Sequence, residues 1–277
     1  MTLTACRLLA VLVLLHRTAG VLGADARSSI IGGKNSVKGR WPGMVHLTIT
    51  TETGSPKWRC GATIVSKKWL LTSAHCFDES RKPVLRRSGA WLGALSLQNG
   101  ADRYMFIDSL VRHPEYRNLG DRYENDIALV RLQKEVRFPS QVKTVKLPDG
   151  ATNDLDSSEC WITGWGQVGN AVPLPKPETL QEVKISIMPE VVCKSVYPLL
   201  PANSLCAGTK AGGKDACEGD LGGPLMCRSG GAFVQVGIMS SASCGVPGRP
   251  GIYTRVSKHL RFINDYIHQY EEASAEV

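Results

Sequence analysis

The chain has 277 residues, of which 43% are hydrophobic and 21% charged, and its formal net charge is +8. This length and apolar content allow a sizeable buried core, which excludes a disordered protein and fits one large all-β domain or two smaller domains. The excess of Lys and Arg over Asp and Glu is compatible with binding to polyanions.

The N-terminal segment, residues 1–23, has the pattern of a secretory signal peptide. A basic start precedes an apolar run at residues 8–15, and small residues follow it. The run is too short to cross a bilayer, so we expect a cleaved signal peptide and no membrane anchor. Cleavage after Gly23 or after Ala26 satisfies the small-residue rule. The pattern predicts a secreted, extracellular protein that starts with a short propeptide-like segment, residues 24–29.

The cysteine count supports an oxidising compartment. Of the nine cysteines, Cys6 lies in the expected signal peptide, and an even number remains. Eight cysteines in a secreted chain indicate four disulfides, whose pairing the residues alone leave open. No Cys-x-x-Cys pair indicates zinc, and we expect neither a metal nor a cofactor.

Short runs rich in β-branched residues recur along the chain, separated by turn clusters rich in Gly, Pro and Asp. Such runs predict an all-β barrel or sandwich. The clearest of them are residues 69–72, 127–132, 183–187 and 233–239. One helix is expected near the C-terminus, with Ser257 as its N-cap, and a polar tail follows at residues 271–277. The residues expected on its apolar face are Leu260, Ile263, Ile267 and Tyr270.

Three separated segments together indicate a catalytic arrangement. An apolar strand ends in Thr-Ser-Ala-His-Cys, which contains His75, and another begins with Asn-Asp-Ile-Ala-Leu, which contains Asp126. Either residue alone fits a structural role at a strand end. The turn at residues 219–224, Gly-Asp-Leu-Gly-Gly-Pro, follows them in the chain. The order His, Asp and nucleophile turn is that of a catalytic triad.

These segments resemble the chymotrypsin and trypsin family of serine proteases, and the resemblance covers a domain at residues 30–270. Further matching motifs lie at residues 30–33, 164–166, 215–220 and 251–256. The segment 173–183 is most similar to the tryptase-like branch. The resemblance implies two antiparallel six-stranded β-barrels with a C-terminal α-helix and the active site between the barrels. The disulfides that it implies are Cys60–Cys76, Cys160–Cys227, Cys193–Cys206 and Cys217–Cys244.

The resemblance also assigns roles to site residues. His75 would take a proton from the nucleophile, Asp126 would hold the imidazole tautomer, and the N–H groups of Gly219 and Leu221 would stabilise the oxyanion. The nucleophile position, which is Ser in the family, is Leu221 itself. A hydrocarbon side chain cannot attack a carbonyl or form an acyl-enzyme, so covalent catalysis by this route is excluded.

The family's activation switch is altered as well. In the family, a cut after Arg or Lys frees an Ile amino group that pairs with the Asp preceding the nucleophile; these residues correspond to Ile30 and Asp220. Ser29 precedes Ile30, and the nearest basic residue is Arg27. We therefore expect a broken switch and an unformed loop at residues 219–221, unless another protease cuts after Ser29.

The expected specificity pocket is half retained. Asp215 matches the acidic floor that binds Lys or Arg side chains through a buried ion pair, and Gly251 matches a wall glycine. The adjacent segment, usually Ser-Trp-Gly, is Ser240-Ser241-Ala242. Ser241 lacks the apolar surface that the Trp side chain would provide, and Ala242 places a methyl group at the pocket mouth. We therefore expect basic ligands to enter the pocket less well.

Two basic segments, residues 34–40 and 81–87, raise another class of function. They fit binding to heparin-like polyanions or anionic membranes, and equally fit solvated loops. No motif indicates nucleic-acid recognition.

Three hypotheses for the function follow from the sequence. The first is a secreted serine protease homologue without peptidase activity that binds a protein partner, a protease inhibitor or surface glycans. The second is an active trypsin-like endopeptidase cleaving after Lys or Arg, and the third is an electrostatic polyanion binder. The first is preferred because of Leu221.

Overall fold

The computed structural model describes residues 30–55, 57–99, 103–139, 141–149, 157, 159–169 and 171–275, with side chains up to residue 270. The expected signal peptide and propeptide-like segment lie outside the described residues. Among the residues described, no helix is long and apolar enough to cross a bilayer.

The first barrel closes six antiparallel strands in the order β2-β3-β4-β9-β6-β5. Their bounds are β2 Met44–Thr50, β3 Lys57–Ile64, β4 Trp69–Thr72, β5 Gly89–Leu92, β6 Arg103–Arg112 and β9 Ala128–Leu132. Side chains alternate between the two faces of a strand, so Val45, Leu47 and Ile49 of β2 all point into the barrel core. This barrel corresponds to the first apolar runs of the sequence.

The second barrel has the order β11-β10-β13-β14-β15-β12, and pairing of β11 with β12 closes it. Its strands are β10 Cys160–Gly164, β11 Gln181–Ile187, β12 Ser204–Gly208, β13 Pro224–Ser229, β14 Ala232–Ser241 and β15 Gly251–Arg255. A short strand, β1 (Lys34–Asn35), pairs with the edge of β11. The predicted fold of two six-stranded barrels is confirmed.

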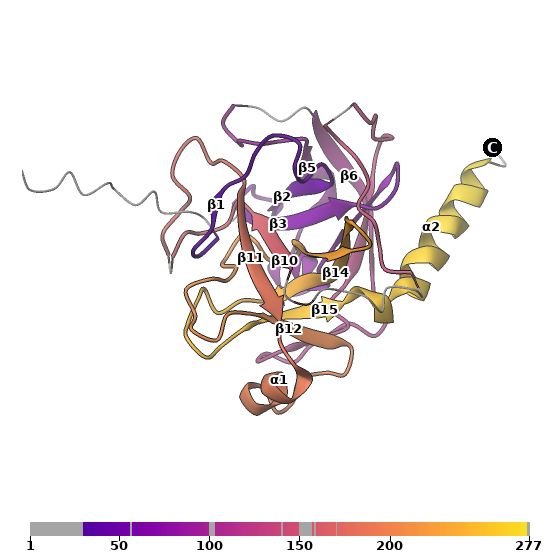
Figure 1. Cartoon of the computed structure of the whole chain (residues 1–277). Helices are drawn as coiled ribbons and strands as arrows, with labels where there is room; N and C mark the ends of the chain where they lie inside the picture. Colours follow the sequence, from indigo (N-terminus) through magenta and orange to yellow (C-terminus); the bar gives the residue numbers. More distant parts are fainter. Residues whose placement is uncertain are drawn as a thin grey trace, which may run out of the picture.

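Few other elements cover the barrels. Figure 1 shows the first barrel in purple above the second in orange, with α1 below and α2 projecting at the right. The helices are α1 Glu190–Val196 and α2 Leu260–Ala275, and β7 (Arg117–Asn118) and β8 (Tyr123–Glu124) form a small hairpin. Single 3-10 turns are η1 Ala74–Phe77, η2 Glu79–Arg81, η3 Leu85–Arg87 and η5 Val256–Lys258. The four disulfides join the cysteine pairs that the family resemblance implied.

The start of the C-terminal helix differs from the prediction. Ser257 lies in η5, and α2 begins at Leu260. The amide of His259 donates to the carbonyl of Val256, which closes a separate turn before the helix. Ser257 is therefore not the N-cap. Of the predicted face, Ile263 is buried in a core cluster, and the Tyr270 ring contacts that of Trp69 at 5.4 Å.

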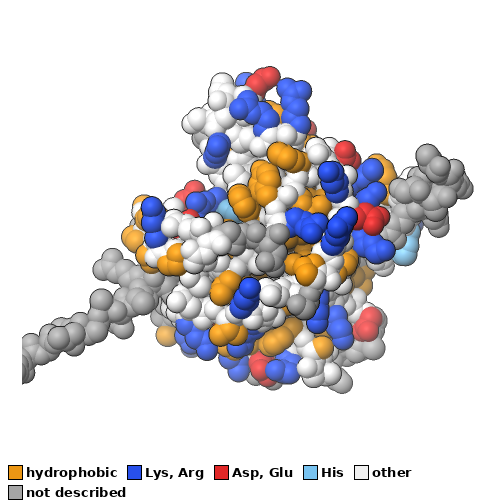
Figure 2. All heavy atoms as spheres, turned by 90° about the horizontal axis from the view of Figure 1, so that it is seen from above, with side chains coloured by type: hydrophobic (Ala, Val, Ile, Leu, Met, Phe, Trp, Pro, Cys, Tyr) orange, Lys and Arg blue, Asp and Glu red, His pale blue; other side chains and the backbone are white. Residues whose placement is uncertain are grey.

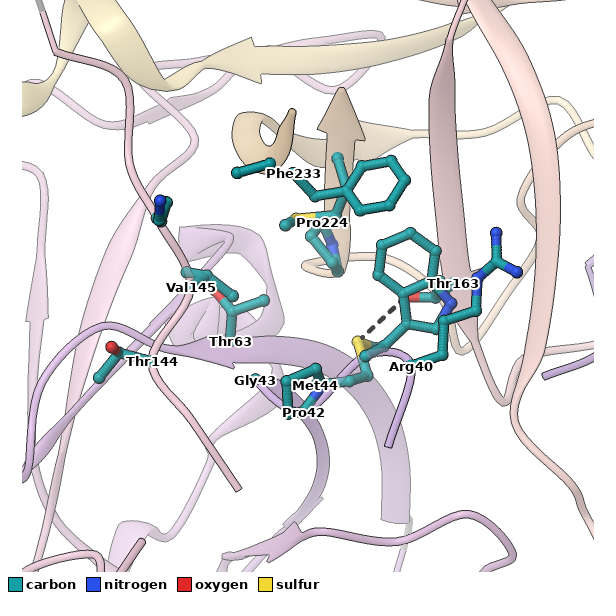
Figure 3. Close-up of a pocket in the computed structure, with 14 residues that line it drawn as sticks. Arg40, Pro42, Gly43, Met44, Thr63, Thr144, Val145, Thr163, Pro224 and Phe233 are labelled. Carbon is teal, nitrogen blue, oxygen red and sulfur yellow. Dashed lines mark hydrogen bonds between the residues drawn. The ribbon is translucent and has the colours of Figure 1, made fainter. Parts of the chain in front are cut away.

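A cavity of about 180 Å³ lies at the seam between the barrels. Residues of the first barrel, including Met44 and Thr63, and of the second, including Thr163 and Pro224, line it (Figure 3). The Thr163 hydroxyl donates to the Met44 sulfur at 3.3 Å. The cavity shares no lining residue with the grooves around His75, so it is separate from the candidate site.

Candidate functional site

The register of β4 and β9 brings His75 and Asp126 together. Thr72 pairs with Ala128, so η1 after β4 and the residues before β9 lie at the same end of the barrel. His75 Nδ1 lies 2.7 Å from Asp126 Oδ2, and the His75 amide donates to Oδ1 at 2.9 Å. The Ser240 hydroxyl donates to the same carboxylate at 2.5 Å. Because a carboxylate only accepts, these contacts hold the imidazole with its proton on Nδ1.

An aromatic column covers His75. The ring of Tyr123 in β8 stacks on His75 with centroids 4.8 Å apart and planes tilted by 14°. Tyr116 stacks in turn on Tyr123 at 6.4 Å, and its hydroxyl donates to Asp78 at 3.1 Å. Stacking on the small hairpin thereby fixes the plane of the imidazole, and Asp126 fixes its tautomer.

The side chain at the nucleophile position is apolar and packs against the protein. Leu221 is partly buried against the core of the second barrel, and its carbonyl accepts from the Gly61 amide at 2.8 Å. His75 Nε2, the atom that would face a nucleophile, is buried and has no hydrogen-bond partner among the described residues. The pair of His75 and Asp126, called the dyad below, is therefore assembled, but residue 221 has no hydroxyl group for it to activate.

The loop around Leu221 is ordered, which differs from the unformed loop expected without a released Ile30. The amide of Asp220 donates to Cys217 O at 3.0 Å, and that of Gly222 donates to Met239 O at 2.8 Å. The amides of Gly219 and Leu221 make no hydrogen bond to another described residue. These two N–H groups are thus available to a ligand carbonyl, as an oxyanion site requires.

Contacts of the Asp220 carboxylate explain the order of the loop. Asp220 is fully buried and accepts from the amides of Gly166 at 2.7 Å and Cys217 at 3.1 Å. Burial raises its pKa to about 7. Ile30 is buried in the core of the second barrel, and Ile31 forms a β-bridge to Asp215. The segment from Ile30 therefore lies beside the loops that carry the candidate site.

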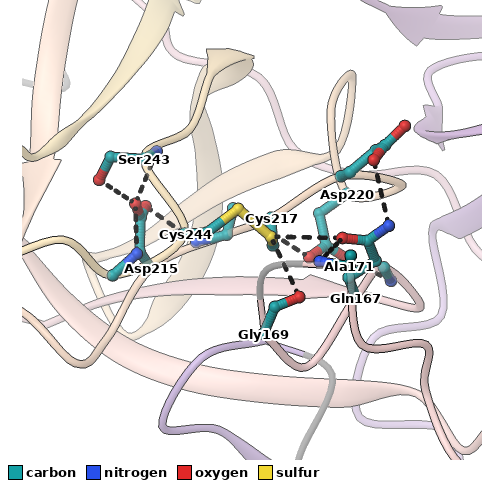
Figure 4. Close-up of a disulfide and its surroundings, with 12 residues drawn as sticks. Gln167, Gly169, Ala171, Asp215, Cys217, Asp220, Ser243 and Cys244 are labelled. Carbon is teal, nitrogen blue, oxygen red and sulfur yellow. Dashed lines mark hydrogen bonds between the residues drawn. A yellow bond between two sulfur atoms is a disulfide. The ribbon is translucent and has the colours of Figure 1, made fainter.

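Asp215 is closed off rather than lining an open pocket. Its side chain accepts from the amide of Ala216 at 2.8 Å, the amide and hydroxyl of Ser243 at 3.0 and 2.8 Å, and the amide of Gly245 at 3.2 Å. Figure 4 shows Ser243 directed at Asp215 beside the Cys217–Cys244 disulfide. Asp215 is only 2% exposed, and burial raises its pKa.

The other predicted pocket residues contact different groups. The Ser240 hydroxyl donates to Asp126, and Ala242 packs against the core of the second barrel. Gly251 lies against Asp215, because a Cβ added at Gly251 would be 2.9 Å from Asp215 Oδ1. Sequence reasoning missed Ser243. The signal that could have found it is its position next to Cys244, because the implied disulfide to Cys217 draws this segment over Asp215.

Two grooves flank the dyad. The His75 groove, of about 560 Å³, contains His75, Leu221 and Gly219, with Trp58 and Arg59 on one wall and Glu178 and Glu218 among the other lining residues. The Ser241 groove, of about 520 Å³, lies between the Tyr123 hairpin, the segment 196–201 and the segment 240–243. Either is large enough for several residues of a peptide.

The two basic segments differ in how their charges are engaged. Glu182, which is buried, lies 3.1 Å from Arg40 and 3.9 Å from Lys34. Arg40 also stacks on the Trp161 ring at 4.6 Å, and Arg81 on Trp58 at 5.5 Å. Figure 2 shows Lys and Arg side chains in several separate groups on the face seen from above. Partial neutralisation by Glu182 weakens the first segment as a polyanion site.

A metal site is not formed where three potential ligands meet. Cys60, His75 and Cys76 lie within 4.8 Å of one another, but the two sulfurs are bonded as a disulfide. Zinc binds cysteine as the thiolate, and a disulfide has none. These residues do not fit a metal.

Comparison with known proteins agrees with this geometry. Residues 30–263 match the family described as Trypsin. This chain belongs to the trypsin family. It is 35% identical to human testisin over 259 residues, covering 87% of this chain and 79% of testisin, and 32% identical to human serine protease 41, covering 86% and 76%. Mouse neuropsin, described as a serine protease expressed in the limbic system of the brain, superposes with a TM-score of 0.71 at 30% identity, covering 85% of this chain and 98% of neuropsin.

Proposed function

We propose that this trypsin-family protein is a secreted homologue of the tryptase-like branch that does not hydrolyse peptides and acts by binding a protein partner or a protease inhibitor. One observation carries the proposal: Leu221 occupies the nucleophile position, while His75 Nε2 is buried and has no hydrogen-bond partner in the described part of the chain. The ordered cleft supports binding, because the dyad, the two free amides and both grooves are retained without the atom needed for acyl transfer.

Labelling with a serine-directed phosphonate tests the loss of chemistry. The protein, with and without cleavage before Ile30, is incubated with the probe and with fluorogenic Lys and Arg substrates, and trypsin serves as the positive control. We expect neither covalent labelling nor hydrolysis. Stoichiometric labelling in the cleft would instead support an active endopeptidase that cleaves after Lys or Arg.

Polyanion binding is less well supported. Glu182 engages Lys34 and Arg40, so only part of the positive charge of this segment is free for sulfate groups. We expect the protein to elute from a heparin column at modest salt concentration, because affinity depends only weakly on salt when few Lys and Arg side chains contact sulfate groups. Retention at high salt would favour the polyanion function.

A further inference from the structure

Recognition of a basic side chain at Asp215 is blocked by the chain itself. Ser243 supplies both its amide and its hydroxyl to Asp215 Oδ2, and Gly245 adds a third donor. A Lys or Arg ligand would have to displace these bonds and enter a space from which Asp215 is 98% shielded. The disulfide from Cys244 to Cys217 holds the Ser243 segment in place. The Ser241 groove accordingly does not include Asp215 among its lining residues.

The Ser241 groove has a mixed surface, in which apolar side chains lie beside polar and charged ones. Its floor carries the small side chains of Ser241 and Ala242, where a Trp shelf is expected from the family resemblance. Its walls include Tyr123 and Leu199, and Leu199 is a large apolar side chain with 66% exposure. Exposed apolar walls around a concave surface favour burial of a bulky ligand side chain. An indole or phenyl ring from a partner would occupy the space that the missing Trp leaves.

The charges around the groove are predominantly positive. Arg249 lines it and interacts with the hydroxyl of Tyr197, and it pairs with no carboxylate among the described residues. Within the described residues, Arg122 pairs only with its neighbour Asp121, at 3.2 Å and with the carboxylate 69% exposed, and its buried Nε has no hydrogen-bond partner. An exposed pair of adjacent residues contributes little stability, so an incoming carboxylate can compete for Arg122. Guanidinium groups bind carboxylates with two parallel hydrogen bonds.

We propose that the Ser241 groove binds an extended peptide segment of a partner protein in which a bulky aromatic side chain lies next to a carboxylate. The aromatic ring fills the space above Ser241 and Ala242, and Arg249 and Arg122 bind the acid. This proposal rests on the non-hydrolytic binding function and specifies the chemistry of the partner. It replaces recognition of Lys or Arg with recognition of an acidic and aromatic segment.

Three matched peptides test the proposal: acetyl-Glu-Trp-Glu-amide, acetyl-Gln-Trp-Gln-amide and acetyl-Lys-Trp-Lys-amide. Their dissociation constants are measured by calorimetry with the full-length secreted protein. We expect the acidic peptide to bind at least about tenfold more tightly than the basic one, with the neutral peptide between them. No measurable binding of the acidic peptide at millimolar concentration, or tighter binding of the basic peptide, would overturn the proposal.

Variants separate the parts of the groove. Arg249→Gln should weaken the acidic peptide by about fivefold or more and leave the neutral peptide unchanged. Arg261→Gln, which removes a 93% exposed arginine on α2, is the charge-matched control and should change neither. Ser241→Trp should weaken all three peptides by filling the groove, with its thermal unfolding measured to show that it is folded. Equal effects of Arg249→Gln and Arg261→Gln would contradict the assigned role of Arg249.

Benzamidine and heparin provide two further comparisons. Benzamidine, a probe for an open Asp215 pocket, should bind Ser243→Gly and not the natural protein; binding to the natural protein would contradict the closure by Ser243. If Ser241→Trp binds the acidic peptide as tightly as the natural protein does, and heparin displaces it equally from both, the binding is that of a polyanion site outside the groove and the proposal is overturned. Failure of the peptides to bind leaves phosphonate labelling unaffected, so the two proposals fail by different measurements.

Discussion

Leu221 changes the chemistry of the cleft while leaving its neighbours in place. The imidazole of His75 is held by Asp126 and by stacking with Tyr123, and neither contact involves the nucleophile. Leu221 itself packs against the second barrel. The positions of His75 and Asp126 therefore depend on contacts that a nucleophile does not provide.

Asp220 should make the stability of the protein depend on pH. Burial raises its pKa from 3.8 to about 7, so the folded chain holds a proton that the unfolded chain has lost over this interval. The stabilising contribution is complete below pH about 4 and is lost as the pH rises to about 7. The contribution of Asp220 to the free energy of unfolding should fall by up to about 4 kcal/mol across this window. Burial lowers the pKa of His46 to about 3, which contributes with the opposite sign, so the Asp220 contribution is measured as the difference in urea denaturation between the natural protein and Asp220→Asn at several pH values.

Asp220→Asn should remove the Asp220 contribution, so that its free energy of unfolding falls less, or rises more, between pH about 4 and about 7 than that of the natural protein, because the amide does not ionise. Asp265→Asn, at an exposed position on α2, is the matched control and should keep the slope of the natural protein. Identical slopes in all three proteins would show that Asp220 titrates normally. Cleavage before Ile30 should also flatten the slope if the new ammonium group reaches the Asp220 carboxylate.

The loop that carries Leu221 fits between the barrels only because glycines line it. Gly222 has a φ of +81°, and a Cβ there would lie 2.3 Å from Thr72 Oγ1 and 2.6 Å from Gly61 O. A Cβ at Gly61 would lie 2.7 Å from the Cα of Gly223. The backbones of β3 and of this loop thus approach more closely than side chains would permit.

Gly222→Ala should lower the free energy of unfolding by about 2–5 kcal/mol, because it combines a left-handed backbone with overlap against Thr72 and Gly61. Gly230→Ala is the matched control. Its φ is +53° and no atom lies within 4 Å of the added Cβ, so only the backbone cost of about 1–2 kcal/mol remains. Denaturant unfolding of both variants checks this, and equal losses would exclude a steric role for Gly222.

The strands could be predicted from the sequence because their pattern is local. The run at residues 69–72 coincides with β4, and that at 183–187 lies within β11. The helix start was misplaced, since the turn that ends at His259 depends on a backbone bond that composition does not show. The closure of Asp215 by Ser243 was not predicted, although the implied Cys217–Cys244 disulfide was, because the direction of the Ser243 amide and hydroxyl depends on the fold of the segment before Cys244.

The candidate site lies where the two barrels meet, so its function depends on both. His75 and Asp126 come from the first barrel, whereas Leu221, Asp215 and Ser243 belong to loops of the second. The Gly61 amide of β3 donates to Leu221 O and links the two. If the protein lacks hydrolysis as we propose, we expect recovery of catalysis to require three distant features together: a nucleophile, an ammonium group near Asp220 and an open pocket at Asp215.

Leu221→Ser alone should not restore hydrolysis after Arg. The new hydroxyl would face His75, but Asp220 would still lack a cation and Ser243 would still cover Asp215. Adding Ser29→Arg allows trypsin to release Ile30, whose ammonium group can stabilise the ionised Asp220 and the oxyanion amides beside it. Both oxyanion amides already lie in an ordered loop and are free of other described residues, so this step should raise kcat by less than the factor of about 10²–10³ that loss of one oxyanion donor costs.

Ser243→Gly, as the third change, should lower KM for an Arg substrate because it removes the side chain and the hydroxyl bond that cover Asp215, leaving only backbone amides as its donors. We expect the processed triple variant to exceed the processed double variant in kcat/KM, measured with a fluorogenic Arg peptide, and both to exceed Leu221→Ser by far more than the separate effects combined. The matched control is the unprocessed triple variant, which should stay nearly inactive. Full activity from Leu221→Ser alone would show that neither the amino terminus nor Ser243 limits the site, because the nucleophile would then be the only missing part.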